Sequence, residues 1–367
     1  MDLYIGLMSG TSMDGIDAAL VQFDGDTPTL LATHGQRWPV PVVNRLHELC
    51  TPGANEIDRL GRMDQLVAIH FAQAVKALLA KGPYRPEQVR AIGSHGQTIR
   101  HRPEQGFTLQ IGHGARLAVE TGIDVICDFR MKDVALGGQG APLVPAFHQA
   151  VFGAPGKLRF ILNIGGIANI SVLPGRDDQV LGFDTGPGNT LMDLWYRKHK
   201  GGSYDPQGGW AASGFVSEDL LGRLMKHPFL AQSAPKSTGR ETFTLAWLEL
   251  FLAERPPLRP EDVQRTLLEF TARTIVDALL PQAEGQAAEL FICGGGIHNR
   301  ALMLRLYEML PGWQLDSTEA LGLHPDWVEA IAFAWLAKCF INRQTGNLPA
   351  VTGAKRPAIL GCLYPVD

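Results

Sequence analysis

Two stretches of the sequence share one strand–turn plan, and this duplication restricts the possible folds more than any other feature. In the first stretch, three apolar runs are separated by turns, at residues 3–8, Ile16–Phe23 and Thr29–Thr33. In the second stretch the corresponding runs are Leu158–Ile164, Asn169–Leu173 and Gln179–Phe183. Glycines lie in the first turn of both stretches, as is typical of antiparallel strands joined by tight loops. The sequence therefore predicts two similar domains that each begin with a β-meander.

Helical periodicity follows each meander. Apolar residues recur at steps of three and four at residues 57–78 and 263–278. Asn55 is a suitable N-cap for the first of these helices, and Pro281 predicts the end of the second. Later patterns indicate a buried strand and two more helices, at Leu290–Cys293, Ala301–Leu310 and Val328–Ile341. Strands that alternate with helices predict an α/β fold, and the meanders make its β-sheets mixed.

Length and composition narrow the class of protein. The chain has 367 residues, of which 45% are hydrophobic, so it has enough apolar side chains for two cores. A net charge of −4 without a basic run argues against a nucleic-acid partner or a membrane partner. No secretory signal, long apolar segment or paired-cysteine motif is apparent. We therefore expect a cytoplasmic protein in which two domains enclose a ligand-binding cleft.

The loop after the first apolar run has a composition suited to phosphate. It combines glycines, hydroxyl side chains and acids, namely Gly6, Gly10, Gly15, Ser9, Thr11, Ser12, Asp14 and Asp17. Unblocked backbone amides and hydroxyls can hold a phosphate chain, and a carboxylate can hold its Mg²⁺ or act as a base. The alternative is an ordinary β-hairpin whose turn happens to be rich in glycine.

A second polar cluster, Gly182–Asn189, leaves a strand and enters a helix that starts near Leu191. Asp184 is placed at the strand tip, where it could act as a general base for a hydroxyl or a water. Gly186, Gly188 and the helix N-terminus could face an anion. The alternative is an Asx-turn that closes the strand.

The third cluster, Cys293–Asn299, resembles a dinucleotide-binding fingerprint, with Asp316 at a suitable distance for a ribose hydroxyl. A nicotinamide-binding domain is therefore an alternative. Asn299 weakens it, because the fingerprint requires a third glycine at that position. The sequence contains no GxxxxGK[ST] motif, which argues against a P-loop kinase.

The fourth cluster consists of short polar residues that alternate with glycine, at Ser94–His101, Phe107–Gly112, Asp128–Arg130 and Gly137–Pro142. Such residues suit a hydroxyl-rich ligand, and Arg130 could pair with a carboxylate in a forked geometry. We interpret His95 and His101 as structural histidines. The turn Lys236–Arg240 could reach phosphate or could be a solvated loop.

With these clusters established, the chain strongly resembles the anhydro-N-acetylmuramic acid kinases of the sugar kinase/Hsp70/actin superfamily. The resemblance covers essentially the whole chain and is carried by Gly6–Gly15, Gly93–Thr98, Gly137–Pro145, Asn163–Gly166, Phe183–Asn189, Pro235–Glu241 and Cys293–Gly296. It implies two RNase H-like (actin-like ATPase) domains, at residues 1–131 with 345–367 and at 132–344, around an ATP and substrate cleft. It also implies a homodimer.

The resemblance further implies the ligands and the residues that bind them. ATP and Mg²⁺ are the expected cofactors, with the metal carried by ATP near Asp14. The implied ATP- and phosphate-binding residues are Gly10, Thr11, Ser12, Met13, Asp14, Gly15, Ile16, Asp17, Gly165, Gly186, Gly188, Asn189, Gly294, Gly295 and Gly296. The implied sugar-binding residues are Thr98, Arg130 and Glu329. For Glu329, a capping or solvent-facing role in its helix is the alternative.

The family converts 1,6-anhydro-N-acetylmuramic acid, a sugar of cell-wall turnover, into N-acetylmuramic acid 6-phosphate with ATP. Because the anhydro bridge leaves O6 without a proton, a base must deprotonate a water that attacks C1 while O6 takes the phosphoryl group. Asp184 resembles that catalytic base. Two alternatives remain at this point, namely a sugar kinase of the same fold acting on an ordinary hydroxyl and a non-catalytic nucleotide-dependent interaction protein.

Overall fold

The computed structural model describes residues 2–175, 179–239, 242–254 and 256–367. The chain forms two compact units, unit 1 (Met1–Phe152 with Trp327–Asp367) and unit 2 (Gly153–Asp326). These limits differ from the expected boundaries, which lie after residues 131 and 344. The reason is that two helices, α5 (Val144–Phe152) and α11 (Val328–Ile341), belong to unit 1, where α11 contacts both α5 and the sheet.

Unit 1 is built on a mixed sheet of order β13-β7-β4-β1-β2-β3. Its strands are β1 (Leu3–Met8), β2 (Gly15–Asp24), β3 (Thr27–Arg37), β4 (Val89–Ser94), β7 (Val125–Cys127) and β13 (Cys362–Tyr364). The first three strands form the predicted antiparallel meander, while β4 runs parallel to β1 and β7 runs parallel to β4. A separate hairpin joins β5 (Gln97–Arg102) to β6 (Phe107–Ile111).

Unit 2 repeats this plan in the order β10-β9-β8-β11-β12. Its strands are β8 (Arg159–Ile164), β9 (Ile167–Leu173), β10 (Leu181–Pro187), β11 (Glu289–Cys293) and β12 (Gln314–Ser317). The meander is antiparallel, and β11 and β12 run parallel to β8. Both sheets thus place the first strand centrally, between its meander and two parallel strands. This shared order confirms the predicted duplication and the mixed α/β class of RNase H-like units.

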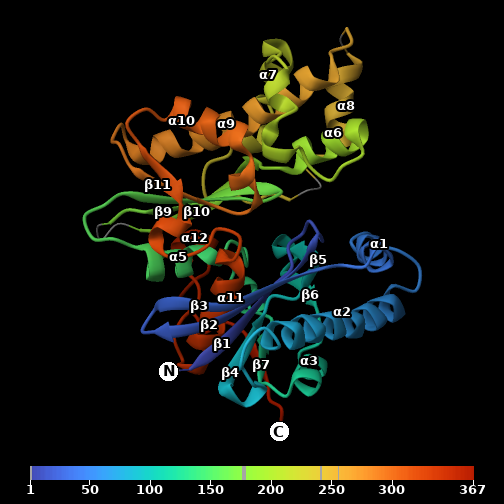
Figure 1. The fold of residues 1–367 in the computed structure, drawn as a ribbon, viewed down its shortest axis with the longest axis vertical. Coiled ribbons are helices and arrows are strands. Elements are labelled where there is room, and N and C mark those ends of the chain that lie inside the picture. Colours follow the sequence, from blue (N-terminus) through green and yellow to red (C-terminus); the bar gives the residue numbers. More distant parts are fainter. Residues whose placement is uncertain (1, 176–178, 240–241, 255) are drawn as a thin grey trace. The chain divides into compact units, whose positions relative to one another are not determined.

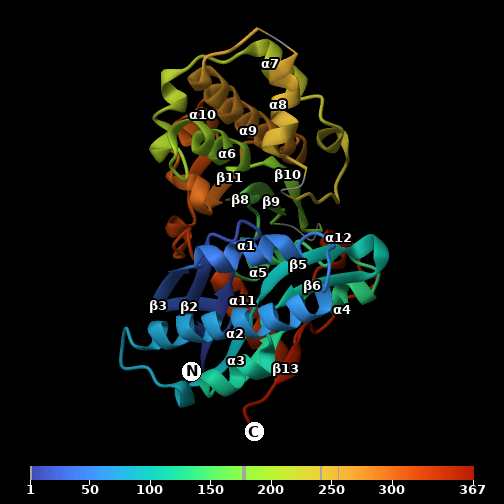
Figure 2. The same ribbon diagram turned by 90° about the vertical axis from the view of Figure 1, so that its right-hand side faces the viewer.

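Helices cover both faces of the sheet in unit 1. The helices besides α5 and α11 are α1 (Val40–Leu49), α2 (Glu56–Leu79), α3 (Gly114–Thr121), α4 (Met131–Ala135) and α12 (Pro349–Thr352). Side chains alternate along β1, so Ile5 and Leu7 join the core beneath α2 whereas Gly6 faces α11. Figure 1 shows the red helix α11 beside the blue strands, and Figure 2 shows α2 with α3.

The contact between α11 and this sheet requires glycine. A Cβ atom on Gly6 would lie 1.7 Å from the carbonyl oxygen of Ala330, and one on Gly93 would lie 2.0 Å from that of Phe333. The helix backbone therefore rests directly on β1 and β4. Gly6 lies within β1, between its partners Ala19 of β2 and Gly93 of β4, so we correct our interpretation of Gly6 as a phosphate-facing amide.

In unit 2, the long helix α9 (Pro260–Ala283) lies at the centre of the helical layer. The others are α6 (Thr190–Lys200), α7 (Glu218–Leu224), α8 (Leu245–Ala253) and α10 (Arg300–Met309). Figure 1 shows α9 and α10 side by side on this sheet. The helix α9 continues two residues past Pro281, where the sequence predicted its end. Among the described residues, no helix is long and apolar enough to cross a membrane.

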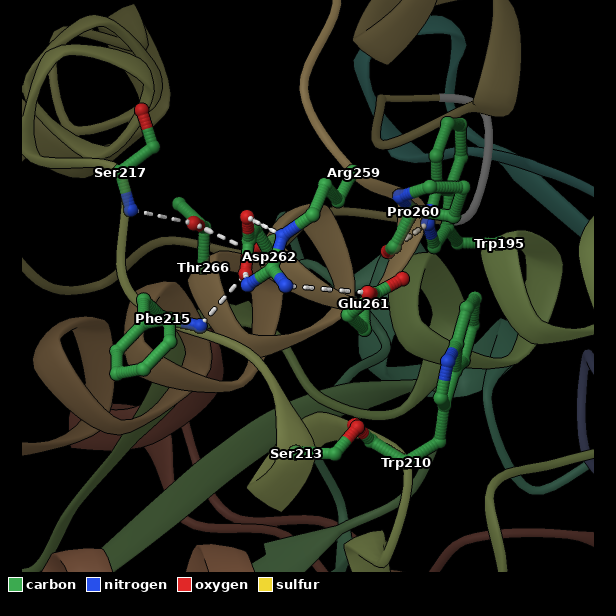
Figure 3. Close-up of polar contacts among 10 residues, drawn as sticks. All are labelled: Trp195, Trp210, Ser213, Phe215, Ser217, Arg259, Pro260, Glu261, Asp262 and Thr266. Carbon is green, nitrogen blue, oxygen red and sulfur yellow. Dashed lines mark hydrogen bonds and ion pairs between the residues drawn. The ribbon is translucent and has the colours of Figure 1, made fainter.

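A polar network fixes the segment before α7 to the first turns of α9 (Figure 3). Asp262 accepts hydrogen bonds from the backbone amide of Phe215 at 2.8 Å and from Nε of Arg259 at 2.9 Å. The amide of Ser217 donates to Oγ1 of Thr266 at 2.9 Å. These bonds satisfy backbone groups that would otherwise be unpaired in a connection without regular structure.

Candidate active site

The loop between β1 and β2 is held at its base by side chains. Oγ of the buried Ser9 lies 2.7 Å from Oε1 of Gln97 and 2.8 Å from the carbonyl oxygen of Gly15. The indole of Trp38 donates to the same Oγ at 3.0 Å, and Nε2 of Gln97 donates to the carbonyl of Gly10 at 3.1 Å. The Ser9 hydroxyl is therefore a structural group and not a donor for phosphate.

The tip of this loop presents the side chains that could meet a phosphate chain. The amide of Met13 donates to the carbonyl of Gly10 at 3.1 Å, and Met13 has a φ of 55° and is buried. This tight turn leaves Thr11 and Asp14 exposed and Ser12 half-buried. Ile16 lies in the core, so only its backbone can contribute to a phosphate site.

The acidic side chains of this loop suit a metal ion that is already bound to a phosphate ligand. Asp14 is exposed, and Asp17 is half-buried on β2. The described residues contain no group of three or more metal-binding side chains. Mg²⁺ takes most of its ligands from water and phosphate and needs only one or two carboxylates. The carboxylates at the loop therefore fit a Mg²⁺ ion that is bound to phosphate. They do not form a complete coordination shell for a metal ion by themselves.

Arg130, at the start of α4, is fixed by neutral acceptors. Its Nη1 donates to the carbonyl of Gly140 at 2.8 Å, and its Nε and Nη2 lie 3.1 and 3.0 Å from Nε2 of His95. Burial lowers the pKa of Arg130 to about 10, against the charges of Glu329 and Asp133, which raise it. The guanidinium is therefore a cation at neutral pH, close enough to Glu329 to feel its charge.

Thr98 belongs to the same polar group in unit 1. Nε2 of Gln110 donates to Oγ1 of Thr98 at 3.3 Å and to Oγ1 of Thr108 at 2.8 Å. The Thr108 hydroxyl in turn lies 3.0 Å from Nδ1 of His101. Burial and then the charge of Arg130 lower the pKa of His101 to about 4. This series of hydrogen bonds links Thr98 to His101, whose pKa the charge of Arg130 lowers.

Asp184 lies on β10 of unit 2, beside a bulge in that strand. Its Oδ2 accepts a hydrogen bond from the backbone amide of Thr238 at 2.8 Å, and its own amide donates to the carbonyl of Lys236 at 3.1 Å. Burial raises the pKa of Asp184 to about 7, although the Thr238 amide and the Lys236 charge lower it. A carboxyl group with this pKa can accept a proton near neutral pH.

Lys236 supports the segment that carries Thr238. Its Nζ donates to the carbonyls of Phe229 at 3.4 Å and Leu230 at 3.2 Å, and it lies 4.8 Å from the centre of the Phe229 ring. Burial lowers the pKa of Lys236, against the charge of Asp184. Arg240, the last residue of the predicted phosphate-reaching turn, lies outside the described residues.

Other predicted phosphate groups in unit 2 have internal partners. The amide of Gly188 donates to the carbonyl of Gly166 at 2.9 Å, and that of Asn189 donates to the carbonyl of Gly165 at 2.8 Å. A Cβ atom on Gly188 would lie 2.3 Å from the Gly165 oxygen, and one on Gly186 would lie 3.1 Å from Thr274. We therefore correct the prediction that the amides of Gly188 and Asn189 face an anion.

The three glycines after β11 differ from one another in the space around them and in their exposure. Gly294 has a φ of 80°, and a Cβ atom there would lie 2.3 Å from Oδ1 of Asn163. A Cβ atom on Gly296 would lie 2.2 Å from Ile164, whereas one on Gly295 would meet nothing within 4 Å. Only Gly295 is exposed, so it is the glycine of the three that offers backbone to a ligand.

Comparison with known proteins decides the family. The family model described as anhydro-N-acetylmuramic acid kinase matches residues 2–366. The chain belongs to the anhydro-N-acetylmuramic acid kinase family. It is 55% identical to the anhydro-N-acetylmuramic acid kinase of Shewanella pealeana over 366 residues, which cover 99% of each chain. It is 57% identical to that of Shewanella oneidensis over 360 residues, which cover 98% of this chain and 97% of the relative.

Among solved structures, the chain is similar to the activator of 2-hydroxyisocaproyl-CoA dehydratase from Clostridium difficile with bound ADPNP. The TM-score is 0.45 and the identity 12%, over 90% of this chain and 92% of that chain. The family is shown by the family model and by the sequence relatives, and this structural likeness adds nothing to it.

Family membership makes the chain a phosphotransferase and removes the oxidoreductase and the non-catalytic alternatives. The structure gives Asn299, the residue that weakened the dinucleotide fingerprint, a different role. Its Oδ1 accepts from the amide of Leu302 at 3.1 Å and so caps α10. Asp316, the predicted ribose ligand, accepts the amide of Ser317 at 2.7 Å.

Sequence reasoning missed two groups that fix the site residues. Gln97 and Thr238 both lie within motifs that carried the family resemblance, but neither was assigned a role. Gln97 orders the loop after β1 through the carbonyl of Gly10, and the Thr238 amide orients Asp184. Both contacts join residues far apart in the sequence, so no local pattern indicates them.

Proposed function

We propose that this chain uses ATP to open 1,6-anhydro-N-acetylmuramic acid and to phosphorylate O6, giving N-acetylmuramic acid 6-phosphate. The observation that carries the proposal is Asp184, a carboxyl group whose pKa burial raises to about 7 and whose Oδ2 is oriented by a backbone amide. Relatives about 55% identical to this chain are named anhydro-N-acetylmuramic acid kinases, which supports the choice of substrate.

The chemistry of the anhydro bridge explains why such a base is needed. O6 is bonded to C1 and carries no proton, so a base has nothing to remove from it. In the proposed reaction the Asp184 carboxylate takes a proton from water, and the water oxygen forms a bond to C1. The C1–O6 bond breaks, and O6 takes the γ-phosphoryl group of ATP, so that ADP leaves. Water, sugar and ATP thus give sugar 6-phosphate, ADP and one proton.

The polar group of unit 1 is proposed to hold the sugar. Arg130 pairs with the lactyl carboxylate of the substrate, because its fixed guanidinium carries a positive charge and a planar set of donors. Thr98 and Glu329 bind sugar hydroxyl or amide groups. Glu329 is half-buried in the first turn of α11, and its charge reaches Arg130, which favours this role over a solvent-facing one.

The loop Gly10–Asp17 is proposed to hold the phosphates of ATP. Its exposed side chains, Thr11 and Asp14, supply a hydroxyl and a carboxylate. Mg²⁺ bound to the phosphates supplies charge neutralisation for the transferring group, and Asp14 is the residue placed to hold it. Gly295 is proposed as a further nucleotide contact, because its backbone is exposed.

The proposal includes a cytoplasmic location and a homodimer, as the family resemblance implies. The five cysteines are all free thiols, as is usual in the cytoplasm, which supports the first. Size-exclusion chromatography with light scattering tests the second. A monomeric mass of 39.9 kDa across the concentrations used in assays would contradict it.

A substrate comparison tests the proposed function. Purified protein is incubated with ATP and either the anhydro-sugar, N-acetylmuramic acid or glucose, and the products are identified by mass spectrometry and ³¹P NMR. We expect N-acetylmuramic acid 6-phosphate from the anhydro-sugar. Phosphorylation of an ordinary hexose without any use of the anhydro-sugar would favour a kinase of the same fold that acts on a free hydroxyl.

A further inference from the structure

His95 connects two parts of unit 1 that we assigned to different ligands. It follows β4 and is 5% exposed. Its Nδ1 lies 3.1 Å from the carbonyl oxygen of Ser9, at the base of the proposed phosphate loop. Its Nε2 lies 3.1 Å from Nε and 3.0 Å from Nη2 of Arg130. The ring also contacts the side chain of Phe333 on α11, with 4.8 Å between ring centres.

The partners of the imidazole determine its protonation state. A carbonyl oxygen can only accept, so Nδ1 must carry a proton. A guanidinium can only donate, so Nε2 must present its lone pair. The ring is therefore neutral, in a single tautomer. Burial, assisted by the charge of Arg130, lowers the pKa of His95 to about 3, which is consistent with these contacts. His95 thus cannot act as a proton donor or acceptor near neutral pH.

A neutral hydrogen-bond acceptor can hold the Arg130 guanidinium without adding a negative charge beside it. The guanidinium is fixed on one edge by His95 and at Nη1 by the carbonyl of Gly140. Both acceptors hold its plane without neutralising its charge, whereas an aspartate or glutamate at position 95 would compensate that charge. Asp133, whose charge also affects Arg130, accepts from the amide of Gly140 and from the side chains of Asn347 and Thr352.

We propose that His95 is a positioning residue for Arg130. The ring is held by its own contact to the Ser9 carbonyl and fixes the plane of the guanidinium without adding a negative charge beside it, so that Arg130 is oriented toward the carboxylate of the substrate. This inference rests on the proposed function for the identity of that carboxylate. It predicts that His95 determines discrimination between acidic and neutral anhydro-sugars and contributes little to the chemical step.

Two variants separate the contacts of the ring. His95→Asn keeps a donor near the position of Nδ1 for the Ser9 carbonyl but removes the acceptor for Arg130. His95→Gln reaches the position of Nε2 and can present an oxygen to Arg130, but loses the donor. Each is assayed with 1,6-anhydro-N-acetylmuramic acid and with its lactyl amide, which lacks the negative charge.

We expect His95→Asn to raise KM for the acid about tenfold or more, as for loss of a hydrogen bond to a charged group. We expect kcat, KM for ATP and KM for the amide to stay within about twofold, and His95→Gln to recover most of the affinity for the acid. An equal rise in KM for the acid and for the amide would overturn the proposal. An equal rise in KM for the acid in His95→Asn and His95→Gln would also overturn it.

Histidine ¹⁵N NMR of the unmodified protein tests the same point without a variant. We expect His95 to show the tautomer protonated at Nδ1, with no titration between pH 5 and 9. A ring protonated at Nε2, or one that titrates near pH 6.5, would overturn the proposal even if the variants failed to fold. If the unmodified protein did not use the anhydro-sugar at all, the proposed function would fail instead, and the NMR result would still decide the role of His95.

Discussion

The loop after β1 and the turn after β8 follow equivalent strands in two sheets of the same order, yet their backbones are used differently. In unit 1, side chains such as Gln97 hold the base of the loop, and its tip exposes Thr11 and Asp14. In unit 2, the carbonyls of Gly165 and Gly166 accept amides from Gly188, Asn189 and Thr190. Duplication of the fold therefore supplied two similar turns, of which the one in unit 2 is hydrogen-bonded to the segment that follows β10.

The surroundings of the main charged group differ between the two units. Arg130 in unit 1 is held by neutral acceptors and stays a cation at neutral pH. Asp184 in unit 2 is oriented by one backbone amide, and burial raises its pKa to about 7. The first arrangement preserves a charge for binding, whereas the second makes a proton exchangeable. The comparison predicts that substitutions in unit 1 affect sugar affinity and that substitutions around Asp184 affect turnover.

The largest effect is expected at Asp184. Asp184→Asn retains the size of the side chain but cannot accept a proton from water, so we expect kcat to fall by about 10²- to 10⁴-fold. Binding of ATP and of the anhydro-sugar, measured by calorimetry, should change little. A variant with near-normal kcat would remove Asp184 from its role as the base.

At Arg130 we expect a change in affinity instead. Arg130→Met removes the charge that faces the substrate carboxylate, so KM for 1,6-anhydro-N-acetylmuramic acid should rise by about 30- to 100-fold. The lactyl amide of the same sugar is the matched control, and its KM should change much less. A similar rise for both sugars would mean that Arg130 does not recognise the carboxylate.

Alanine substitutions in the loop after β1 and in the segment that packs on the turn after β8 should differ in their effect on stability. Gly188→Ala places a Cβ atom 2.3 Å from the Gly165 oxygen, and we expect the free energy of unfolding to fall by about 1–3 kcal/mol. For Gly10→Ala the nearest atom is Oγ of Ser12 at 3.6 Å, so its unfolding should be nearly unchanged. Chemical denaturation of both variants checks this, and equal stability of the two would contradict the difference between the turns.

The pH dependence should give the smallest but most specific effect. Because the base must be deprotonated, kcat/KM should rise with pH up to the pKa of Asp184 at about 7 and fall about tenfold per unit below it. Lys236→Met removes a charge that lowers this pKa, so the acidic limb should move to higher pH.

Lys236→Arg is the matched control for this profile, since it keeps the charge and should leave the limb nearly in place. A limb that did not move in Lys236→Met would show that the charge of Lys236 does not tune the base. A profile flat between pH 5 and 8 in the unmodified protein would argue that no group with a pKa near 7 controls the reaction.

Much of the architecture was predictable from local sequence patterns. The meanders, the helix α11 and the start of α2 follow from apolar periodicity and turn residues, and the structure confirms them. Gly6 was misinterpreted because its need for glycine comes from α11, more than 300 residues away in the sequence. The expected domain boundaries differ from the limits of the two compact units for the same reason, since only packing shows which sheet a helix covers.

The residues of the candidate site remain a prediction, and the contacts among them come from the structure. The family motifs and the resemblance that they carry indicated Asp184, Arg130 and the loop after β1. They did not indicate that the Thr238 amide orients Asp184 or that His95 fixes Arg130, because these contacts depend on side-chain and loop geometry. Our interpretation of His95 as a structural histidine recognised its burial but missed its contact with Arg130.

The most direct test of the account follows oxygen from water. The reaction is run in ¹⁸O-water with ATP and 1,6-anhydro-N-acetylmuramic acid, and unlabelled product is incubated alongside to measure spontaneous exchange. The account predicts one ¹⁸O atom at C1 of N-acetylmuramic acid 6-phosphate, above that exchange, and none in the phosphoryl group. Product without excess label at C1, or label that enters phosphate instead, would contradict the claim that the enzyme directs a water to the anhydro bridge.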